Sequence, residues 1–526
     1  MTPEEWIAHD PDPQTAAELA ACDAGELAAR FARPLTFGTA GLRGPVRGGP
    51  DAMNLAVVLR ATWAVARVLE NQTAALVVVG RDARHGSAAF ATATAEVLAA
   101  EGFSVLLLPG AVPTPVVAFA VRDTGAAAGI QITASHNPRG DNGYKVYLDS
   151  GIQIISPTDR EIETAMATAP FADEIARKAV EPAGRGLIER YIERAAGVRR
   201  SLRPVRSIRI ALTALHGVGG AVAVETLHRA GFQQVHSVGA QFAPDADFPT
   251  VAFPNPEEPG ATDALLTLAA ETRADVAIAL DPDADRCAVG IPTASGWRML
   301  SGDETGCLLG DYILSHNAVE DPVVASTVVS SRMLAAIAAH YGAMHVETLT
   351  GFKWLARADM GQPGTLVYAY EEAIGHCVDP AAVRDKDGIS AAVLVCDLVA
   401  ALMEQGRSVP ELLDELARRH GVHEVAAVSR RVASTDEAAD LMRRLRAAPP
   451  DRLAGYSANV TDITDAVIFT GGDGDTSVRV VVRPSGTEPK LKCYLEVRCA
   501  ATEDLARARA RADELCDQLI KQVQRW

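Results

Sequence analysis

A serine lies in a loop whose residue types suit chemistry on a hydroxyl group. Ser135 stands within Thr133-Ala134-Ser135-His136-Asn137-Pro138, directly after the apolar run 126–132, which is typical of a buried strand. Open α/β sheets bind their ligands in loops at the carboxyl ends of strands. Taken alone, a serine before His-Asn-Pro is more often part of a turn or a helix cap. The function of Ser135 therefore depends on the rest of the chain.

Three aspartates at alternate positions follow another predicted strand, 275–280; they are Asp281, Asp283 and Asp285. Mg²⁺ prefers oxygen ligands, takes few carboxylates and leaves room for a phosphate oxygen. A calcium loop of the EF-hand type needs glycine after the third acid and helices on both sides, whereas here Arg286 follows and a strand precedes. A solvated acidic turn is the remaining alternative, and we favour a magnesium site.

A third polar loop, Arg483-Pro484-Ser485-Gly486-Thr487-Glu488-Pro489-Lys490, lies between two predicted strands near the C-terminus. One arginine, two hydroxyls and backbone N–H groups beside a glycine are the components of a phosphate-binding loop. An ordinary hairpin loop is the alternative. Together, the serine loop, the metal loop and this phosphate loop predict phosphoryl transfer to and from a serine.

Two charged segments lie between the metal loop and the phosphate loop. Residues 371–376, Glu-Glu-Ala-Ile-Gly-His, which we call the sugar loop, offer carboxylates that could accept protons from sugar hydroxyls. Residues 384–388 add cations. Exposed charged turns are the alternative for both.

Strands that alternate with helices are expected to position these loops. The early strands, predicted at 75–79 and 104–108, are continuous apolar runs, as in a sheet covered on both faces. The alternation restarts after 199–204 and again near Asp321, where a strand is predicted over 323–329. The last part holds short β segments and one closing helix, with Thr502 as its predicted cap.

We therefore predict an α/β fold of three similar α/β domains with mixed sheets, plus a smaller C-terminal α+β domain, around one central cleft. The predicted domains are 1–203 with the serine loop, 204–312 with the metal loop, 313–422 with the sugar loop and 423–526 with the phosphate loop.

The composition limits the class of partner. The chain has 526 residues, enough for roughly three to four domains, and a net charge of −17, which disfavours nucleic acid or an acidic membrane as a general partner. The basic residues of the loops then suit a small phosphorylated ligand. Eight cysteines without a Cys-x-x-Cys pair indicate reduced thiols and no zinc site. The chain shows neither a secretory leader nor a membrane-length apolar run, so a cytoplasmic protein is expected.

With these four loops in this order, the chain resembles the α-D-phosphohexomutase family, which includes phosphoglucomutases and phosphomannomutases. The resemblance spans the whole chain. Details of residues 37–44, 281–286 and 371–375 are most similar to the branch of phosphoglucomutase-2-like and phosphopentomutase-like enzymes.

The resemblance implies roles for the residues that match the family's motifs. It implies that Ser135 carries the phosphate and that Asp281, Asp283, Asp285 and a phosphoserine oxygen bind Mg²⁺. It implies catalytic roles for Lys145, Arg43 and His376, and a mainly structural role for His136. The implied substrate-binding residues are Glu372, Arg286, Lys386 and Lys353, and the implied phosphate-binding residues are Arg483, Ser485, Gly486, Thr487 and Lys490. A hexose 1,6-bisphosphate is implied as the activator that primes the serine.

The sugar loop departs from the hexomutase pattern, because Ile374 stands where a serine is expected two residues after Glu372. The implied reaction exchanges hexose 1-phosphate and 6-phosphate, with glucose first and mannose second, and a pentose remains an alternative. A phosphoserine-dependent phosphatase and a non-catalytic phosphosugar sensor are competing hypotheses. A serine hydrolase is disfavoured because Gly-x-Ser-x-Gly is missing around Ser135. The sequence leaves the oligomeric state open.

Overall fold

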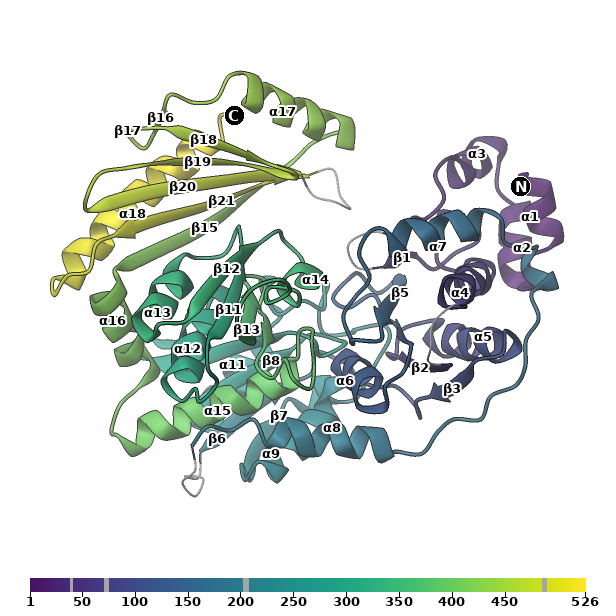
Figure 1. The fold of residues 1–526 in the computed structure, drawn as a ribbon, viewed down its shortest axis with the longest axis horizontal. Helices are drawn as coiled ribbons and strands as arrows, with labels where there is room; N and C mark the ends of the chain where they lie inside the picture. Colours follow the sequence, from purple (N-terminus) through teal and green to yellow (C-terminus); the bar gives the residue numbers. More distant parts are fainter. Residues whose placement is uncertain (38–40, 71–74, 202–207, 485–489) are drawn as a thin grey trace. The chain divides into compact units, whose positions relative to one another are not determined.

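The computed structural model describes residues 1–37, 41–70, 75–201, 208–484 and 490–526 (Figure 1). The chain forms two compact units. The larger unit comprises Met1–Gly302 and Ala373–Ala401, and the smaller unit comprises Asp303–Glu372 and Leu402–Trp526. The fold class predicted from the sequence, α/β with mixed sheets and a different C-terminal domain, is confirmed.

The first sheet of the larger unit is mixed, with the strand order β1-β5-β4-β2-β3. Strands β3, β2 and β4 are parallel, β5 runs antiparallel to β4, and β1 runs antiparallel to β5. The strands are β1 (Leu42–Pro45), β2 (Leu76–Arg81), β3 (Ser104–Leu107), β4 (Ala128–Ile132) and β5 (Asp141–Leu148). The helices are α1 (Pro3–Ala8), α2 (Pro13–Ala20), α3 (Ala24–Ala32), α4 (Leu55–Leu69), α5 (Ser87–Ala100), α6 (Thr114–Thr124), α7 (Thr158–Ala167), a 3-10 turn (Ala172–Glu174) and α8 (Gly186–Ala196).

The second sheet repeats this design with the order β10-β9-β8-β6-β7, in which β7, β6 and β8 are parallel and β9 and β10 are antiparallel. The strands are β6 (Arg209–Thr213), β7 (Gln234–Ser237), β8 (Val276–Leu280), β9 (Cys287–Thr293) and β10 (Gly296–Met299). The helices are α9 (Gly219–Arg229), α10 (Gly239–Phe242) and α11 (Asp263–Glu271). Both β4 and β8 are buried along their whole length, as their apolar sequences predict, and each ends at one of the candidate loops.

The smaller unit combines a parallel sheet with an antiparallel one. Strand β11 (Pro322–Thr327) pairs in parallel with β12 (Met344–Thr348) and β13 (Thr365–Glu371). The final sheet is antiparallel in the order β15-β21-β20-β19-β18. Its strands are β15 (Val422–Arg431), β18 (Asn459–Ile463), β19 (Ala466–Gly472), β20 (Thr476–Pro484) and β21 (Lys490–Cys499), beside a small pair of β16 (Arg452–Leu453) and β17 (Tyr456–Ser457). The remaining elements of the chain are α12 (Gly302–Ser315), α13 (Met333–Tyr341), α14 (Phe352–Leu355), β14 (Gly375–Cys377), α15 (Gly388–Glu404), α16 (Val409–His420), α17 (Thr435–Ala447) and α18 (Leu505–Val523).

Two local predictions are wrong. The strand predicted over 323–329 ends at Thr327, because Val328 and Val329 belong to a turn that packs against the final sheet. Thr502 is not the cap of α18: Asp504 caps it by accepting a hydrogen bond from the Arg507 N–H, while the Thr502 hydroxyl accepts one from the Asp504 N–H. The apolar stripe of α18 consists of Leu505, Ala508, Ala512, Leu515 and Leu519, which are all buried.

All eight cysteines are free thiols, and seven of them are buried. Within the described ranges, no single helix has both the length and the apolar character needed to cross a membrane, whereas α15 and α16 together, as a bent pair, do meet that test.

A buried carboxyl in the smaller unit predicts a pH-dependent stability. Asp303 is 9% exposed and accepts hydrogen bonds from the Ser331 N–H and the Tyr370 hydroxyl, and burial raises its pKa to about 7. Because the folded state holds this proton more tightly than the unfolded state, stability should fall as the pH rises from about 4 to 7. We expect Asp303→Asn to be more stable than the wild type by about 1–4 kcal/mol at pH 8, and by much less near pH 4.

Urea unfolding at both pH values measures this difference. Glu320→Gln, which removes an exposed carboxylate of the same unit, is the control and should change stability little at either pH. An equal response of the two variants would contradict the assignment to Asp303.

Candidate active site

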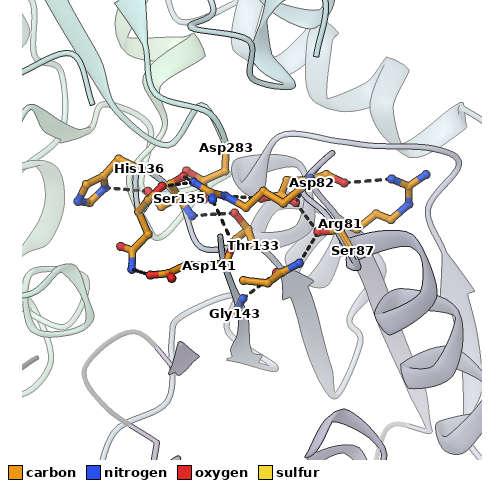
Figure 2. A network of polar contacts seen from close by, with 12 residues as sticks. Arg81, Asp82, Ser87, Thr133, Ser135, His136, Asp141, Gly143 and Asp283 are labelled. Carbon is orange, nitrogen blue, oxygen red and sulfur yellow. Dashed lines mark hydrogen bonds and ion pairs between the residues drawn. The ribbon is translucent and has the colours of Figure 1, made fainter. Parts of the chain in front are cut away.

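The serine loop places one hydroxyl beside the metal loop, within the larger unit. Ser135 follows β4 and is 3% exposed, and its backbone is left-handed with φ of 52°. Its N–H donates to the Thr133 hydroxyl at 2.9 Å. Its Oγ donates to Asp281 Oδ2 at 2.7 Å. The same Oγ lies 3.1 Å from His136 Nδ1 (Figure 2). A non-glycine residue in this strained conformation, held at both ends, is typical of functional sites.

A buried arginine holds the backbone of this loop. Arg84 Nη2 donates to the carbonyls of Ser135 and Asn137, each at 2.6 Å, and Nη1 donates to those of Pro138 at 2.8 Å and Asp141 at 3.1 Å. Asp82 orients Arg84 by accepting a hydrogen bond from its backbone N–H at 2.9 Å. Figure 2 shows Asp82 and Ser87 on one side of this network and the serine loop on the other.

The three aspartates of the metal loop form one buried cluster. Within the described part of the chain, Asp281, Asp283 and Asp285 make up the one acidic or His/Cys group whose ligand atoms lie within 4.8 Å of one another. Lys145 Nζ, from β5, donates to Asp283 at 2.8 Å and to Asp285 at 2.9 Å, and the Thr114 hydroxyl donates to Asp283 at 2.6 Å. One oxygen of Asp283 and one of Asp285 are buried without a hydrogen-bond partner. Buried carboxylate oxygens of this kind fit a hard divalent cation.

The aspartates of the cluster differ in the direction in which their pKa values are shifted. Burial and the two neighbouring carboxylates raise the pKa of Asp281 well above its usual range. Burial acts in the same direction on Asp283, but Lys145 holds the pKa of Asp283 below its usual range. Burial would lower the pKa of Lys145, yet Asp283 and Asp285 reverse this and raise it. Lys145 therefore stays charged and stabilises the negative charge of the carboxylates. Its pKa is not lowered, as proton transfer by this lysine would require.

Other predicted site residues of the larger unit surround this cluster. Arg43 donates to Asn137 Oδ1 at 3.0 Å. Arg286 donates its backbone N–H to Asp281 at 3.0 Å and its guanidinium to the Ala373 carbonyl at 3.2 Å. Lys386 Nζ lies 3.5 Å from Asp285. The structure thus brings Ser135, Lys145, Arg43, Arg286 and Lys386 together around the three aspartates.

His376 has a different environment from these cations. It is fully buried, and burial lowers its pKa to about 3, so the imidazole is neutral. His136 also has a lowered pKa, because of burial and the nearby Arg286 and Arg43.

The smaller unit holds the other predicted substrate-binding residues, Glu372 and Lys353, and the predicted phosphate-binding residues. The Glu372 carboxylate accepts hydrogen bonds from the Thr327 hydroxyl at 3.0 Å and the Ser330 hydroxyl at 3.1 Å, and burial raises its pKa. Lys353 lies in α14 beside Phe352 and is 8% exposed. Arg483 lies 3.7 Å from Asp465, and Lys490 begins β21. Ser485, Gly486 and Thr487 lie outside the described residues.

Four family descriptions match consecutive parts of the chain. They are "Phosphoglucomutase/phosphomannomutase, alpha/beta/alpha" domain I over 34–173, domain II over 189–294 and domain III over 301–420, and the C-terminal domain over 426–515. The chain belongs to the phosphoglucomutase/phosphomannomutase family. It is a phosphomutase of the α-D-phosphohexomutase superfamily, an isomerase that acts as an intramolecular phosphotransferase.

Relatives of this phosphomutase carry different sugar names. A protein of Haemophilus influenzae named "Probable phosphomannomutase" is 39% identical, over 89% of this chain and 98% of its own length. A phosphopentomutase of Homo sapiens is 34% identical, over 90% of this chain and 86% of its own length. A solved structure from Thermus thermophilus, assigned to the phosphomannomutases, is 26% identical with a TM-score of 0.72, covering 93% of this chain and 99% of that one.

Ile374 stands in the sugar loop of this phosphomutase at the position where a serine is expected, and its surroundings give the reason. Its backbone is left-handed with φ of 54°, and its side chain packs in the apolar cluster of the second sheet, with Ala211, Val238 and Leu265 among others. Its carbonyl accepts a hydrogen bond from the Cys287 N–H at 3.0 Å. The isoleucine side chain therefore anchors the loop in a core.

Because Ile374 is buried in a core, we expect its replacement to change the stability of the protein and not its choice of substrate. Ile374→Ser should destabilise the larger unit by about 2–5 kcal/mol, because it leaves a cavity and buries a hydroxyl in apolar surroundings. Ile374→Val, which stays apolar, should cost about 1 kcal/mol. Thermal unfolding measures both. An unchanged melting temperature for Ile374→Ser, with altered preference between glucose and mannose phosphates, would show that the side chain reaches the sugar.

Sequence reasoning missed Arg84 and Thr114. The strand predicted at 75–79 leads into Gly80-Arg81-Asp82, which was a usable signal for a functional turn, but nothing in the sequence shows that Arg84 reaches four carbonyls in another loop. Thr114 resembles an ordinary helix-start residue until the structure places its hydroxyl on Asp283.

Proposed function

We propose that this phosphomutase interconverts hexose 1-phosphate and hexose 6-phosphate, with glucose as the first substrate and mannose as the second, through a phosphoserine at Ser135. The observation that carries the proposal is the 2.7 Å hydrogen bond from the Ser135 hydroxyl to Asp281, inside a buried cluster of three carboxylates and Lys145. A hydroxyl, a cation site and fixed positive charges are the components that phosphoryl transfer requires.

In the proposed cycle, phosphorylated Ser135 gives its phosphoryl group to the free hydroxyl of a sugar monophosphate. The bond between phosphorus and Ser135 Oγ breaks and a bond from phosphorus to the sugar oxygen forms. The sugar hydroxyl loses its proton, and Ser135 Oγ gains one to become a free hydroxyl. The bisphosphate then reverses its orientation and returns the other phosphoryl group to Ser135, which restores the enzyme. A hexose 1,6-bisphosphate is the proposed activator because it phosphorylates the free serine by this second half of the cycle.

We assign Mg²⁺ to Asp281, Asp283, Asp285 and a phosphate oxygen on Ser135. The three buried carboxylates fit this ion, and two of their oxygens have no hydrogen-bond partner. When bound, the ion supplies neutralisation of the charge that develops on the phosphate oxygens. Lys145 and Arg43 add fixed positive charge next to Ser135, and Arg84 holds its backbone.

The remaining assignments follow from the family's motifs. Arg286, Lys386, Lys353 and Glu372 are proposed to bind the sugar phosphate. Arg483, Ser485, Gly486, Thr487 and Lys490 are proposed to hold the phosphate that is not reacting. His376 is proposed as catalytic on the basis of the motif, and its side chain is fully buried.

A pentose phosphate is the alternative to a hexose phosphate as the substrate. The human phosphopentomutase is 34% identical over 90% of this chain, and no serine hydroxyl follows Glu372 at position 374. The proposed setting is the cytoplasm, with a small phosphosugar as the partner.

Phosphorus NMR of the purified protein with Mg²⁺ and a trace of hexose 1,6-bisphosphate tests the function. Glucose, mannose and ribose 1-phosphates are offered separately. Growth of a 6-phosphate signal, fastest for glucose, is expected; fastest growth of the ribose 5-phosphate signal would make the protein a phosphopentomutase. Release of inorganic phosphate alone would establish a phosphatase, and no change with any sugar would favour a phosphosugar sensor.

A further inference from the structure

One turn of the smaller unit, Thr327–Arg332, contacts both the sugar-loop glutamate and the final sheet. We call it the docking turn. It connects β11 to α13. Each of its six residues contacts one of three partners, two residues to each partner. The sequence predicted none of these contacts.

The first partner is the carboxylate of Glu372. The hydroxyls of Thr327 and Ser330 both donate to Glu372 Oε2, and the same two hydroxyls lie 2.8 Å apart. Thr327 and Ser330 are 1% and 2% exposed, and each hydroxyl donates its one proton to the carboxylate. Glu372 itself is half-buried.

The second partner is an apolar patch of the final sheet. Val328 and Val329 pack with Ala466, Ile468 and Val481 in one buried cluster. This contact holds the turn against the sheet by the hydrophobic effect, which has no directional requirement.

The third partner is Glu496 of β21, which is 5% exposed. Its Oε1 accepts hydrogen bonds from the Ser331 hydroxyl at 2.9 Å and the Arg332 N–H at 2.8 Å, and its Oε2 accepts one from Arg332 Nε at 2.5 Å. His423 Nδ1 of β15 lies 2.8 Å from Oε1. Burial would raise the pKa of Glu496, but His423 and Arg332 hold it below its usual range.

The contacts of Glu496 with the docking turn do more than attach the turn to the final sheet. Buried charge pairs add little net stability compared with apolar packing, and removal of one partner is costly because the other stays buried. The adjacent valines already provide apolar packing. The carboxylate instead fixes the two residues that directly follow Ser330 in the chain, and Ser330 fixes Glu372.

We propose that Glu496 is a positioning residue, which holds the docking turn and through it the Glu372 carboxylate. The proposal rests on the function proposed above, in which Glu372 binds the sugar and the final domain carries the phosphate loop.

The test compares Glu496→Gln with Glu347→Gln. Glu347 of β12 is the matched control, because it also pairs with the final sheet, through Arg479 at 3.0 Å, but its side chain is 40% exposed and its carboxylate is directed to Arg479 instead of the docking turn. We expect Glu496→Gln to raise the KM for the sugar phosphate about tenfold, with a smaller fall in kcat, and to speed hydrogen exchange at 327–332. Glu347→Gln should change KM less than about twofold.

A double-mutant cycle shows whether the effect passes through Glu372. In a Glu372→Gln background, Glu496→Gln should lose most of its effect on KM. The same tenfold effect in both backgrounds, or no effect in either, would overturn the proposal. Ser331→Ala, a milder change to the same contact, replaces Glu496→Gln if that variant fails to fold.

Hydrogen exchange separates this proposal from the proposed function. If the wild type interconverts no sugar phosphate, the proposed function fails, and faster exchange at 327–332 in Glu496→Gln with unchanged exchange in Glu347→Gln still supports the contact between Glu496 and the turn. Unchanged exchange in both variants contradicts it.

Discussion

Ser135→Ala is expected to abolish mutase turnover, lowering kcat by about 10⁴-fold or more, while the protein stays folded. The serine Oγ is the atom proposed to carry the phosphoryl group, and it is the part of Ser135 that reaches Asp281. The backbone of the loop is held through carbonyl groups, which alanine retains. Phosphorus NMR measures turnover, and mass spectrometry after incubation with hexose 1,6-bisphosphate measures phosphoryl uptake.

Ser104→Ala is the matched control, since Ser104 is an exposed serine of the same domain. It should retain both turnover and phosphoryl uptake, and both variants should melt close to the wild type. Uptake of a phosphoryl group by Ser135→Ala would place the phosphorylated residue elsewhere, and retained turnover would remove the phosphoserine mechanism altogether.

The sequence predicted the positions of these loops well because apolar strands determine them. Strands β4 and β8 are buried on both faces, so their sequences are continuous apolar runs, and the polar residues that follow must lie at the sheet edge. The spacing of Asp281, Asp283 and Asp285 therefore predicted a cluster that the structure shows.

What the sequence could not predict are contacts that depend on three-dimensional direction. The left-handed backbone at Ile374 turns its side chain into a core, whereas sequence reasoning treated the position as part of the sugar site. Val328 and Val329 continue an apolar run and were predicted to extend the strand, because a run of valines does not show whether it pairs with a neighbouring strand or packs against another domain. Arg84 reaches carbonyl groups, which every residue has, so no side-chain pattern marks its partners.

Arg84→Lys is expected to lower kcat by about 10²-fold with little change in KM. A lysine keeps the positive charge but replaces a planar fork of donors with a single ammonium group, which cannot reach four carbonyls at once. Displacement of a nucleophile by about 1 Å is enough for a loss of this size. Steady-state kinetics measure the effect, and the phosphorylated fraction of Ser135 after incubation with bisphosphate should fall in parallel.

The neighbouring arginine provides the control that separates loop geometry from charge. Arg81 donates a hydrogen bond to the Asp82 carbonyl at 3.0 Å, and Arg81→Lys should keep kcat within about twofold of the wild type. Arg84 Cζ also lies 5.0 Å from the centre of the Phe248 ring of the second domain, so its replacement should weaken this contact as well. If Arg84→Lys folds and turns over at the wild-type rate, the hydrogen bond from the Ser135 N–H to Thr133 is sufficient to hold the serine, and the four carbonyl contacts serve stability alone.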